Sequence, residues 1–236
     1  IQACQADEFI YHEMAVHVPL LGKKRSDISV LIVGGGDGGI LREVLVHDFV
    51  KSVTMGEIDK KVIEVSNKFL GIQGNYNDPR VSLIIQDASE FVWSAKKNHL
   101  LYDVIILDLT EPVGPSASVF TLGFVENISK LITPNGIIID SDSVFVAGDH
   151  GYFLQEESSD GENLFSVVRK TKILPNIEIF RTHVPFFPGA DFMFFLYGFG
   201  ETTYKKPFSN FAGRHYNPAI HEAAFALPAW QQNWLY

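Results

Sequence analysis

Acidic side chains follow four successive short apolar stretches of this sequence, at or just beyond the point where each stretch ends. They are Asp37, Glu57, Asp87, Asp108 and Glu111. A single acid in such a place is often only a turn residue or a helix N-cap. Several carboxylates in one cleft repel one another unless a cation is bound, so their recurrence predicts a site for a cationic ligand.

Two of these acids, Asp108 and Glu111, stand three positions apart and precede a rigid Pro-Val-Gly-Pro run. An aliphatic amine is protonated at neutral pH and has no lone pair with which to attack. A carboxylate beside it can bind the ammonium group, accept its proton and leave a nucleophile. The pair therefore suits an amine substrate.

A glycine turn lies between the first apolar run and a helical segment. Gly34, Gly36 and Gly39 fit the pattern G-x-G-x-x-G, and Glu57 follows Asp37 by twenty positions, the reach to an acid that holds both hydroxyls of a ribose. Asp37, inside the turn, would repel a pyrophosphate but attract a cation. The turn thus predicts a positively charged nucleoside such as S-adenosylmethionine or a relative, the alternative being a tight turn without a ligand.

Buried apolar runs alternate with helical patterns, which predicts a parallel sheet covered by helices on both faces, of the Rossmann-like doubly wound class. The predicted strands are 29–33, 52–58, 81–85, 102–107 and 137–139, then 177–181 and 192–199 after the pattern loosens at Asp140. The predicted helices are 38–47, 60–70, 89–97, 121–131, 160–172 and 218–226. Ligands bind beyond the carboxyl ends of such strands, where the acids fall.

The start of the chain predicts an amphipathic helix capped by Asp7 and lying on the core. We divide the chain into an N-terminal segment, residues 1–28, and a catalytic domain, residues 29–236.

The composition excludes some partners. The chain carries 19 Lys and Arg against 28 Asp and Glu, a formal charge of −9, so nucleic acid is not expected, whereas a polyamine or another cationic metabolite suits this balance. Its single cysteine, Cys4, permits no intrachain disulfide and fits a reducing cytoplasm. No run reaches the roughly 18 apolar residues of a membrane span, so no membrane partner is expected.

Six stretches together resemble the spermidine synthases, the aminopropyltransferase family that uses decarboxylated S-adenosylmethionine. They are Asp7–Met14, Gly34–Gly39, Glu57–Asp59, Asp87, Asp108–Pro115 and Tyr216–Phe225. The resemblance runs through almost the whole chain and implies a Rossmann-like sheet of the S-adenosylmethionine-dependent methyltransferase type. It also implies a homodimer or homotetramer, and a small N-terminal β domain of the family that this sequence lacks.

The resemblance implies a role for each matching residue. Glu57 would hold the ribose, Asp87 and the backbone of Ala88 the adenine, with Pro115 nearby, and Asp37 and His12 would line the aminopropyl end. The cosubstrate positions are His12, Gly34, Gly36, Asp37, Glu57, Asp87, Ala88 and Pro115. Asp108 would be the catalytic base, and the amine positions are Tyr11, Asp37, Asp108 and Glu111. No metal and no tightly bound cofactor are expected, because the sulfonium leaving group is already cationic.

The acceptor side departs from the family pattern. Glu111 replaces an aspartate, Ser141 and Ser143 replace Gln and Glu, and Phe187 replaces a tyrosine. Putrescine is the expected acceptor, with spermidine, agmatine and cadaverine as alternatives. The rival functions are an S-adenosylmethionine-dependent methyltransferase and a non-catalytic polyamine-binding relative.

Overall fold

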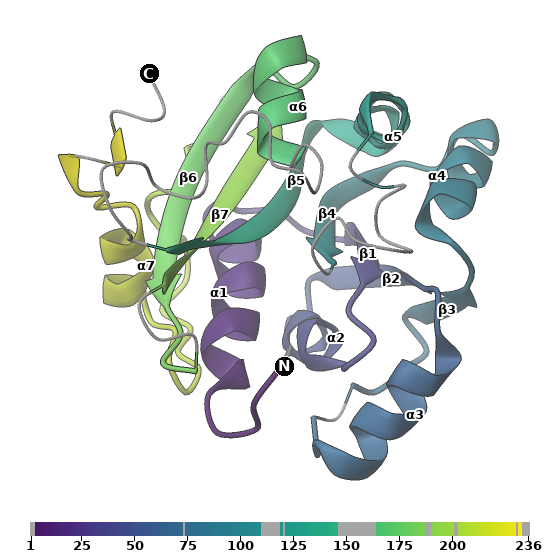
Figure 1. Ribbon diagram of the computed structural model, residues 1–236, viewed down its shortest axis with the longest axis horizontal. Helices are drawn as coiled ribbons and strands as arrows, with labels where there is room; N and C mark the ends of the chain where they lie inside the picture. Colours follow the sequence, from purple (N-terminus) through teal and green to yellow (C-terminus); the bar gives the residue numbers. More distant parts are fainter. Residues whose placement is uncertain are drawn as a thin grey trace.

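A seven-stranded mixed sheet forms the centre of the molecule, with strand order β3-β2-β1-β4-β5-β7-β6 (Figure 1). Its strands are β1 (Ile28–Gly34), β2 (Val50–Glu57), β3 (Val81–Ile85), β4 (Tyr102–Asp108), β5 (Ile132–Phe145), β6 (Asn176–His183) and β7 (Ala190–Gly198). The computed structural model describes residues 3–72, 74–109, 119, 121–145, 164–186, 190–200, 203–229 and 231–232.

The prediction of a parallel sheet is confirmed for the first five strands, and the two strands after the pattern loosens pair in the antiparallel direction. The strands β1 to β5 pair in parallel, whereas β7 lies between β5 and β6 and is antiparallel to both. Only seven positions separate the end of β6 at His183 from the start of β7 at Ala190. Antiparallel neighbours can be joined by so short a connection, whereas parallel ones need a crossover of a dozen residues or more.

The strand predicted at 137–139 is much longer in the structure. It begins at Ile132, and its pairing with β4 shifts register between Tyr102 and Val104. The strand also continues beyond Asp140, because β7 pairs with it as far as Phe145. Ser141 therefore belongs to a strand of the sheet and does not follow it.

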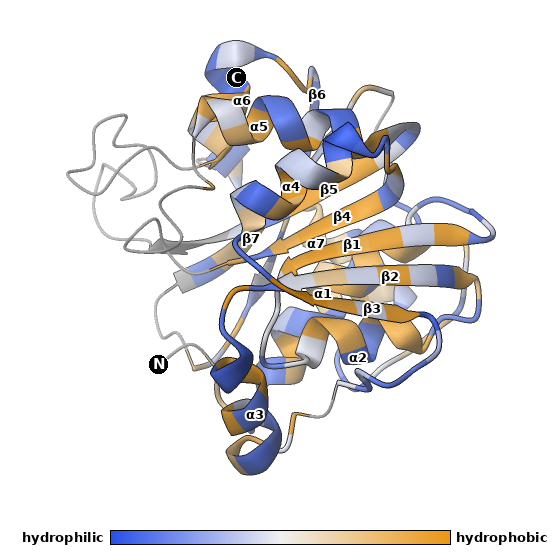
Figure 2. Cartoon of the chain, turned by 90° about the vertical axis from the view of Figure 1, so that its right-hand side faces the viewer, coloured by the Kyte–Doolittle hydropathy of each residue, from blue (hydrophilic) through white to orange (hydrophobic). Residues whose placement is uncertain are grey.

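Helices cover both faces of the sheet and enclose one apolar layer on each side (Figure 2). On one face lie α4 (Ala88–Lys97), α5 (Leu122–Ile128) with the short η2 (Ser129–Leu131), and α6 (Leu164–Thr171). On the other face lie α1 (Glu8–Leu21), α2 (Gly39–Leu45) and α7 (Pro218–Ala224). The exposed α3 (Lys60–Phe69) follows β2, with only Ile63 and Ser66 buried. In the described part of the chain, no helix is both long enough and apolar enough to cross a bilayer.

The first helix is more deeply buried than the amphipathic helix, lying on the core, that the sequence predicts. Every residue from His12 to Leu21 is buried, so α1 forms part of the core and packs against α2. Asp7 stands at the N-cap but makes no capping bond, and its Oδ2 accepts the backbone N–H of Phe186 at 2.7 Å. The buried polar side chains of α1 are Glu8, His12, Glu13 and His17. Each of them needs a hydrogen-bond partner, and Glu8 and His12 bind each other.

The strand order reverses between β1 and β4, the place where sheets of this class bind ligands. Gly34 at the end of β1 is the register partner of Asp108 at the end of β4, and β2 ends beside them at Glu57. The carboxyl ends of β1, β2 and β4 therefore meet at one edge of the sheet.

Candidate active site

The glycine turn brings two strand ends into direct contact. Gly34 has φ +84°, and a Cβ there would collide with the backbone carbonyl of Asp108. That carbonyl accepts the N–H of Gly35 at 3.1 Å, which locks the turn to the end of β4. Only glycine combines this positive φ with so close an approach. The first glycine of the motif is thus required by the protein's own packing.

The other two glycines of the motif make room for side chains of the site. A Cβ at Gly36 would lie 2.5 Å from Oε2 of Glu57, and a Cβ at Gly39 would collide with the imidazole ring of His12. Glu57 is buried, with Oε1 accepting the N–H of Asp59 at 2.9 Å and Oε2 left facing the turn. The motif therefore lets two polar side chains approach the backbone.

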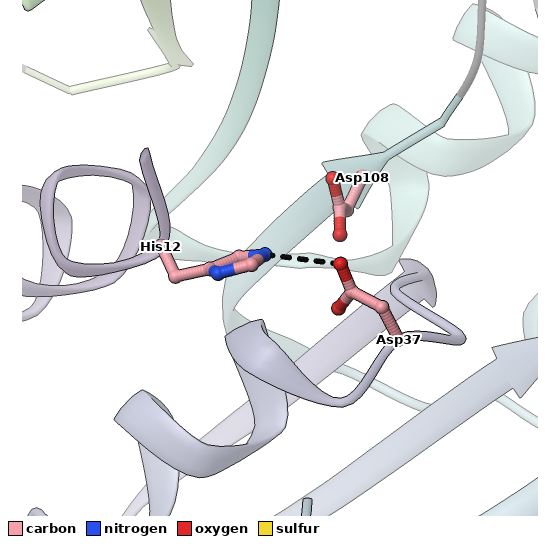
Figure 3. Close-up of side chains that lie close together, drawn as sticks. All are labelled: His12, Asp37 and Asp108. Atoms are coloured by element: carbon pink, nitrogen blue, oxygen red, sulfur yellow. Dashed lines mark ion pairs between the residues drawn. The ribbon is translucent and has the colours of Figure 1, made fainter. Parts of the chain in front are cut away.

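His12, Asp37 and Asp108 converge at the switch point from α1, the glycine turn and β4 (Figure 3). One polar atom from each of them lies within 4.8 Å of the others. His12 Nε2 and Asp37 Oδ2 form an ion pair at 3.3 Å, and Asp37 Oδ1 accepts the N–H of Gly39 at 2.8 Å. The structure thus brings together three residues that are far apart in the sequence.

The two aspartates differ in protonation behaviour. Burial raises the pKa of the Asp108 carboxyl to about 6, and the negative charge of Asp37 adds to this effect, against the opposing influence of His12 and Tyr11. Burial acts on Asp37 in the same direction, but the hydrogen bond and charge of His12 lower the pKa of Asp37 below its ordinary value. Environments that push the pKa values of two carboxyl groups apart in this way are typical of an acid–base pair. Asp108 is the member suited to take up a proton near neutral pH.

His12 is held as a cation between two carboxylates. Its Nδ1 lies 2.5 Å from Oε2 of Glu8, and its Nε2 pairs with Asp37. Burial alone would lower the pKa of His12, but the hydrogen bonds to Asp37 and Glu8 raise it to about 10. An imidazolium donates from both nitrogens and has no lone pair for a metal ion. The cluster of His12, Asp37 and Asp108 is therefore better suited to an organic cation than to a metal.

Tyr11 connects Asp108 of β4 to Ser141 of β5. Its hydroxyl donates to Asp108 Oδ1 at 2.9 Å and lies 2.9 Å from the hydroxyl of Ser141. Its ring packs against Phe192 and Phe194 of β7, with ring centroids 5.4 and 5.5 Å away. Burial, followed by the charge of Asp108, raises the pKa of the Tyr11 hydroxyl well above its usual value. Tyr11 is thus a neutral hydrogen-bond donor with a fixed direction.

The remaining predicted residues have different outcomes. Asp87 is the N-cap of α4, where its Oδ1 accepts the N–H groups of Ser89 and Glu90. It therefore has the helix-capping role that is the alternative for a single acid at a strand end. Ala88 is the first residue of the same helix. The predicted residues outside the described part of the chain are Glu111, Pro115 and Phe187, together with the side chain of Ser143.

Three residues beside the site were missed by sequence reasoning. Glu8 binds His12, Arg42 binds Glu8, and the Tyr76 hydroxyl donates to the Gly36 carbonyl at 3.3 Å. Glu8 could have been found, because it precedes His12 by four positions and so shares its face of a helix. Arg42 and Tyr76 carry no comparable local signal.

The fold and the site together define a Rossmann-like protein with a cluster of acidic side chains at its switch point. The family model for the spermine/spermidine synthase domain matches residues 8–196. A polyamine aminopropyltransferase of Salmonella arizonae is 38% identical over 239 residues, which cover 97% of this chain and 78% of that protein. One from an Enterobacter species is 36% identical over 245 residues, covering 99% of this chain and 79% of the relative.

Solved structures agree with this result. A spermidine synthase in complex with the transition-state analogue AdoDATO superposes with a TM-score of 0.79 at 30% identity, over 96% of this chain and 75% of that one. The spermidine synthase of Thermotoga maritima gives a TM-score of 0.78 at 29% identity, over 97% of this chain and 75% of that one. The chain belongs to the spermine/spermidine synthase family of polyamine aminopropyltransferases.

Proposed function

We propose that this enzyme transfers the aminopropyl group of decarboxylated S-adenosylmethionine to putrescine, releasing spermidine and methylthioadenosine. The observation that carries the proposal is the state of Asp108. This partly buried carboxyl group has a pKa of about 6, receives a hydrogen bond from Tyr11 and lies beside a second carboxylate, that of Asp37. Such a group can bind an ammonium ion and then accept its proton.

The chemistry is an in-line displacement. Asp108 takes a proton from the acceptor ammonium, and the freed nitrogen lone pair attacks the carbon next to the sulfonium. The new C–N bond forms as the C–S bond breaks, and the bonding electrons leave with sulfur as a neutral thioether. The positions that we assign to the amine are Tyr11, Asp37, Asp108 and Glu111.

The nucleoside half would lie along the glycine turn. Glu57 has a buried carboxylate whose Oε2 faces that turn, which fits a role in holding the ribose hydroxyls. Asp87 and the backbone of Ala88 would hold adenine. The positions that we assign to the cosubstrate are His12, Gly34, Gly36, Asp37, Glu57, Asp87, Ala88 and Pro115.

The charge of Asp37 would also select the cosubstrate. A carboxylate at this place attracts the free amine of the decarboxylated nucleoside and repels the carboxylate of S-adenosylmethionine itself. A methyltransferase, the principal rival, requires the carboxylated form. Calorimetry with both nucleosides separates the two functions, and tighter binding of S-adenosylmethionine would contradict our proposal.

The acceptor is tested by mass spectrometry of the products from decarboxylated S-adenosylmethionine and four amines. We expect the highest kcat/KM with putrescine, with spermidine, agmatine and cadaverine behind it. A higher kcat/KM with one of the other three amines would support the proposed chemistry but contradict putrescine as the acceptor. In that case Phe187→Tyr, which restores the family's hydroxyl, should raise kcat/KM for putrescine. The absence of any aminopropylated product would indicate a non-catalytic relative.

We also propose that the enzyme is a homodimer or homotetramer of the cytoplasm. The family resemblance supports the assembly, and the single cysteine, Cys4, suits a reducing compartment. Light scattering on the purified protein tests the assembly, because a monomeric mass at micromolar concentration would contradict it.

A further inference from the structure

A row of charged side chains of alternating sign runs from the site into the interface between α1 and α2. Asp37 pairs with His12 at 3.3 Å, and His12 lies 2.5 Å from Glu8. The two oxygens of Glu8 accept from Arg42, Oε1 from Nη1 at 3.1 Å and Oε2 from Nη2 at 2.9 Å. Arg42 Nε donates to Glu43 at 2.7 Å. One unbroken chain of ion pairs thus links the glycine turn to the second turn of α2.

The row continues to a pair of buried imidazoles. Glu43 Oε2 lies 3.2 Å from Nε2 of His17, outside hydrogen-bond geometry, and His17 Nδ1 lies 3.0 Å from Nε2 of His47. Burial, followed by the charge of His17, lowers the pKa of His47 to about 3. His47 is therefore neutral at working pH and closes the row without adding a charge.

The row is sheltered from water at its centre. The side chains of His12 and Glu8 are 4% and 5% exposed, and that of Arg42 is 28% exposed. Removing an ion from water is costly, so buried charges persist only where their geometry and hydrogen bonds are good. Burial would raise the pKa of Glu8, but the bonds from His12 and Arg42 lower it to about 2. Glu8 is thus a permanent anion beside His12.

The geometry gives Glu8 and Arg42 separate tasks. Oε2 of Glu8 is shared by Nδ1 of His12 and Nη2 of Arg42, so the bidentate arginine sets the direction of the oxygen that His12 meets. Around His12, the facing groups are Glu8 of its own helix, Asp37 of the glycine turn, Asp108 of β4 and the ring edge of Tyr11. Of the three facing carboxylates, Glu8 pairs with Nδ1 of the ring, whereas Asp37 pairs with Nε2.

We propose that Glu8 and Arg42 are positioning residues, which hold His12 as an imidazolium against Asp37 and so fix the carboxylate that receives the cationic end of the cosubstrate. The expected effect on KM rests on the proposed function. The charge state of His12 does not depend on that function, and it can be measured on the protein without substrate.

The direct test is NMR titration of His12, with its signal assigned through a His12→Asn variant. In the unmodified protein we expect the imidazolium to persist to a pH of about 10. Glu8→Gln keeps the shape but loses a charged hydrogen bond, so the His12 midpoint should fall by about 1–2 pH units. Glu64→Gln is the matched control, since it removes the same charge from an exposed pair with Lys60 and should leave the midpoint unchanged.

Kinetics supply the second readout. Glu8→Gln and Arg42→Met should each raise the KM for the decarboxylated nucleoside about tenfold or more, with a smaller change in the KM for the amine. Arg42→Lys keeps the charge without the bidentate fork and should recover part of the loss. Equal changes in both KM values, or no rescue by lysine, would contradict a positioning role.

An unchanged His12 midpoint in folded Glu8→Gln overturns the inference, whatever happens to activity. If Glu8→Gln does not fold, the double variant Glu8→Gln/Arg42→Met removes both charges together and carries the same prediction for His12. A protein that transfers no aminopropyl group but shows the shifted His12 midpoint would contradict the proposed function alone.

Discussion

Replacing Asp108 by asparagine should inactivate the enzyme and at the same time stabilise the unliganded protein. The variant retains the shape of the side chain and an oxygen that can accept from Tyr11, which donates to Oδ1 at 2.9 Å. It cannot accept a proton from the amine. Turnover should therefore fall by roughly 10²–10⁴-fold, the usual contribution of a general base. Affinity for methylthioadenosine should barely change.

The stabilisation follows from the raised pKa. Burial and the charge of Asp37 raise the pKa of Asp108 from 3.8 to about 6, so the folded protein holds this proton more tightly than the unfolded chain does. The resulting stability is fully present below pH 3.8 and is lost as the pH rises through about 6. A gap of about two pKa units corresponds to about 3 kcal/mol. Asp108 is not fully buried, and water screens part of this effect, so we expect a gain of about 1–2 kcal/mol for Asp108→Asn above neutral pH.

Urea unfolding at several pH values between 4 and 8 measures this difference. The advantage of Asp108→Asn should be largest near pH 8 and should shrink toward pH 4, where both side chains are neutral in the folded state. An asparagine variant that is no more stable than the unmodified protein at pH 8 would refute the reasoning about burial and charge. Near-normal turnover would show instead that Asp108 is not the base.

Three further variants test separate parts of the site. Asp37→Asn should weaken binding of decarboxylated S-adenosylmethionine and relax its preference over the carboxylated form, and an unchanged ratio of the two affinities in calorimetry would exclude the charge filter. Tyr11→Phe removes a hydrogen bond to the ionised form of Asp108, so kcat/KM should fall about tenfold or more and the acid limb of its pH profile should move upward, because that bond lowers the pKa of Asp108. Gly39→Ala places a methyl group against the imidazole of His12 and should abolish most activity. In its control, Gly123→Ala in α5, the methyl group meets nothing within 4 Å. This control should leave kcat/KM unchanged, with a free energy of unfolding equal or higher by about 0.5–1 kcal/mol. Equal activity in the two alanine variants would show that the contact with the imidazole does not matter.

Most of the fold could be predicted from the sequence, because the pattern of apolar runs is a local property. The strand predicted at 81–85 has the observed bounds, the one at 102–107 ends one residue early, and the one at 29–33 is one residue short at each end. The directions of β6 and β7 could not be predicted this way. Their neighbours in the sheet are chosen by packing between segments that are distant in sequence, and only the completed sheet places β7 between β5 and β6.

The sequence by itself determined that acids would gather at one edge, because parallel strands bring their carboxyl ends together. It indicated Asp37, Glu57 and Asp108 for this reason, and all three lie around the glycine turn. Only the tertiary structure decided what each group does there. Whether Asp108 can act as a base depends on its burial and on the charges of Asp37 and His12, and His12 is charged because Glu8 and Asp37 flank it. These interactions join side chains up to about a hundred positions apart, and a pKa depends on all the charges and the solvent that surround a group in space.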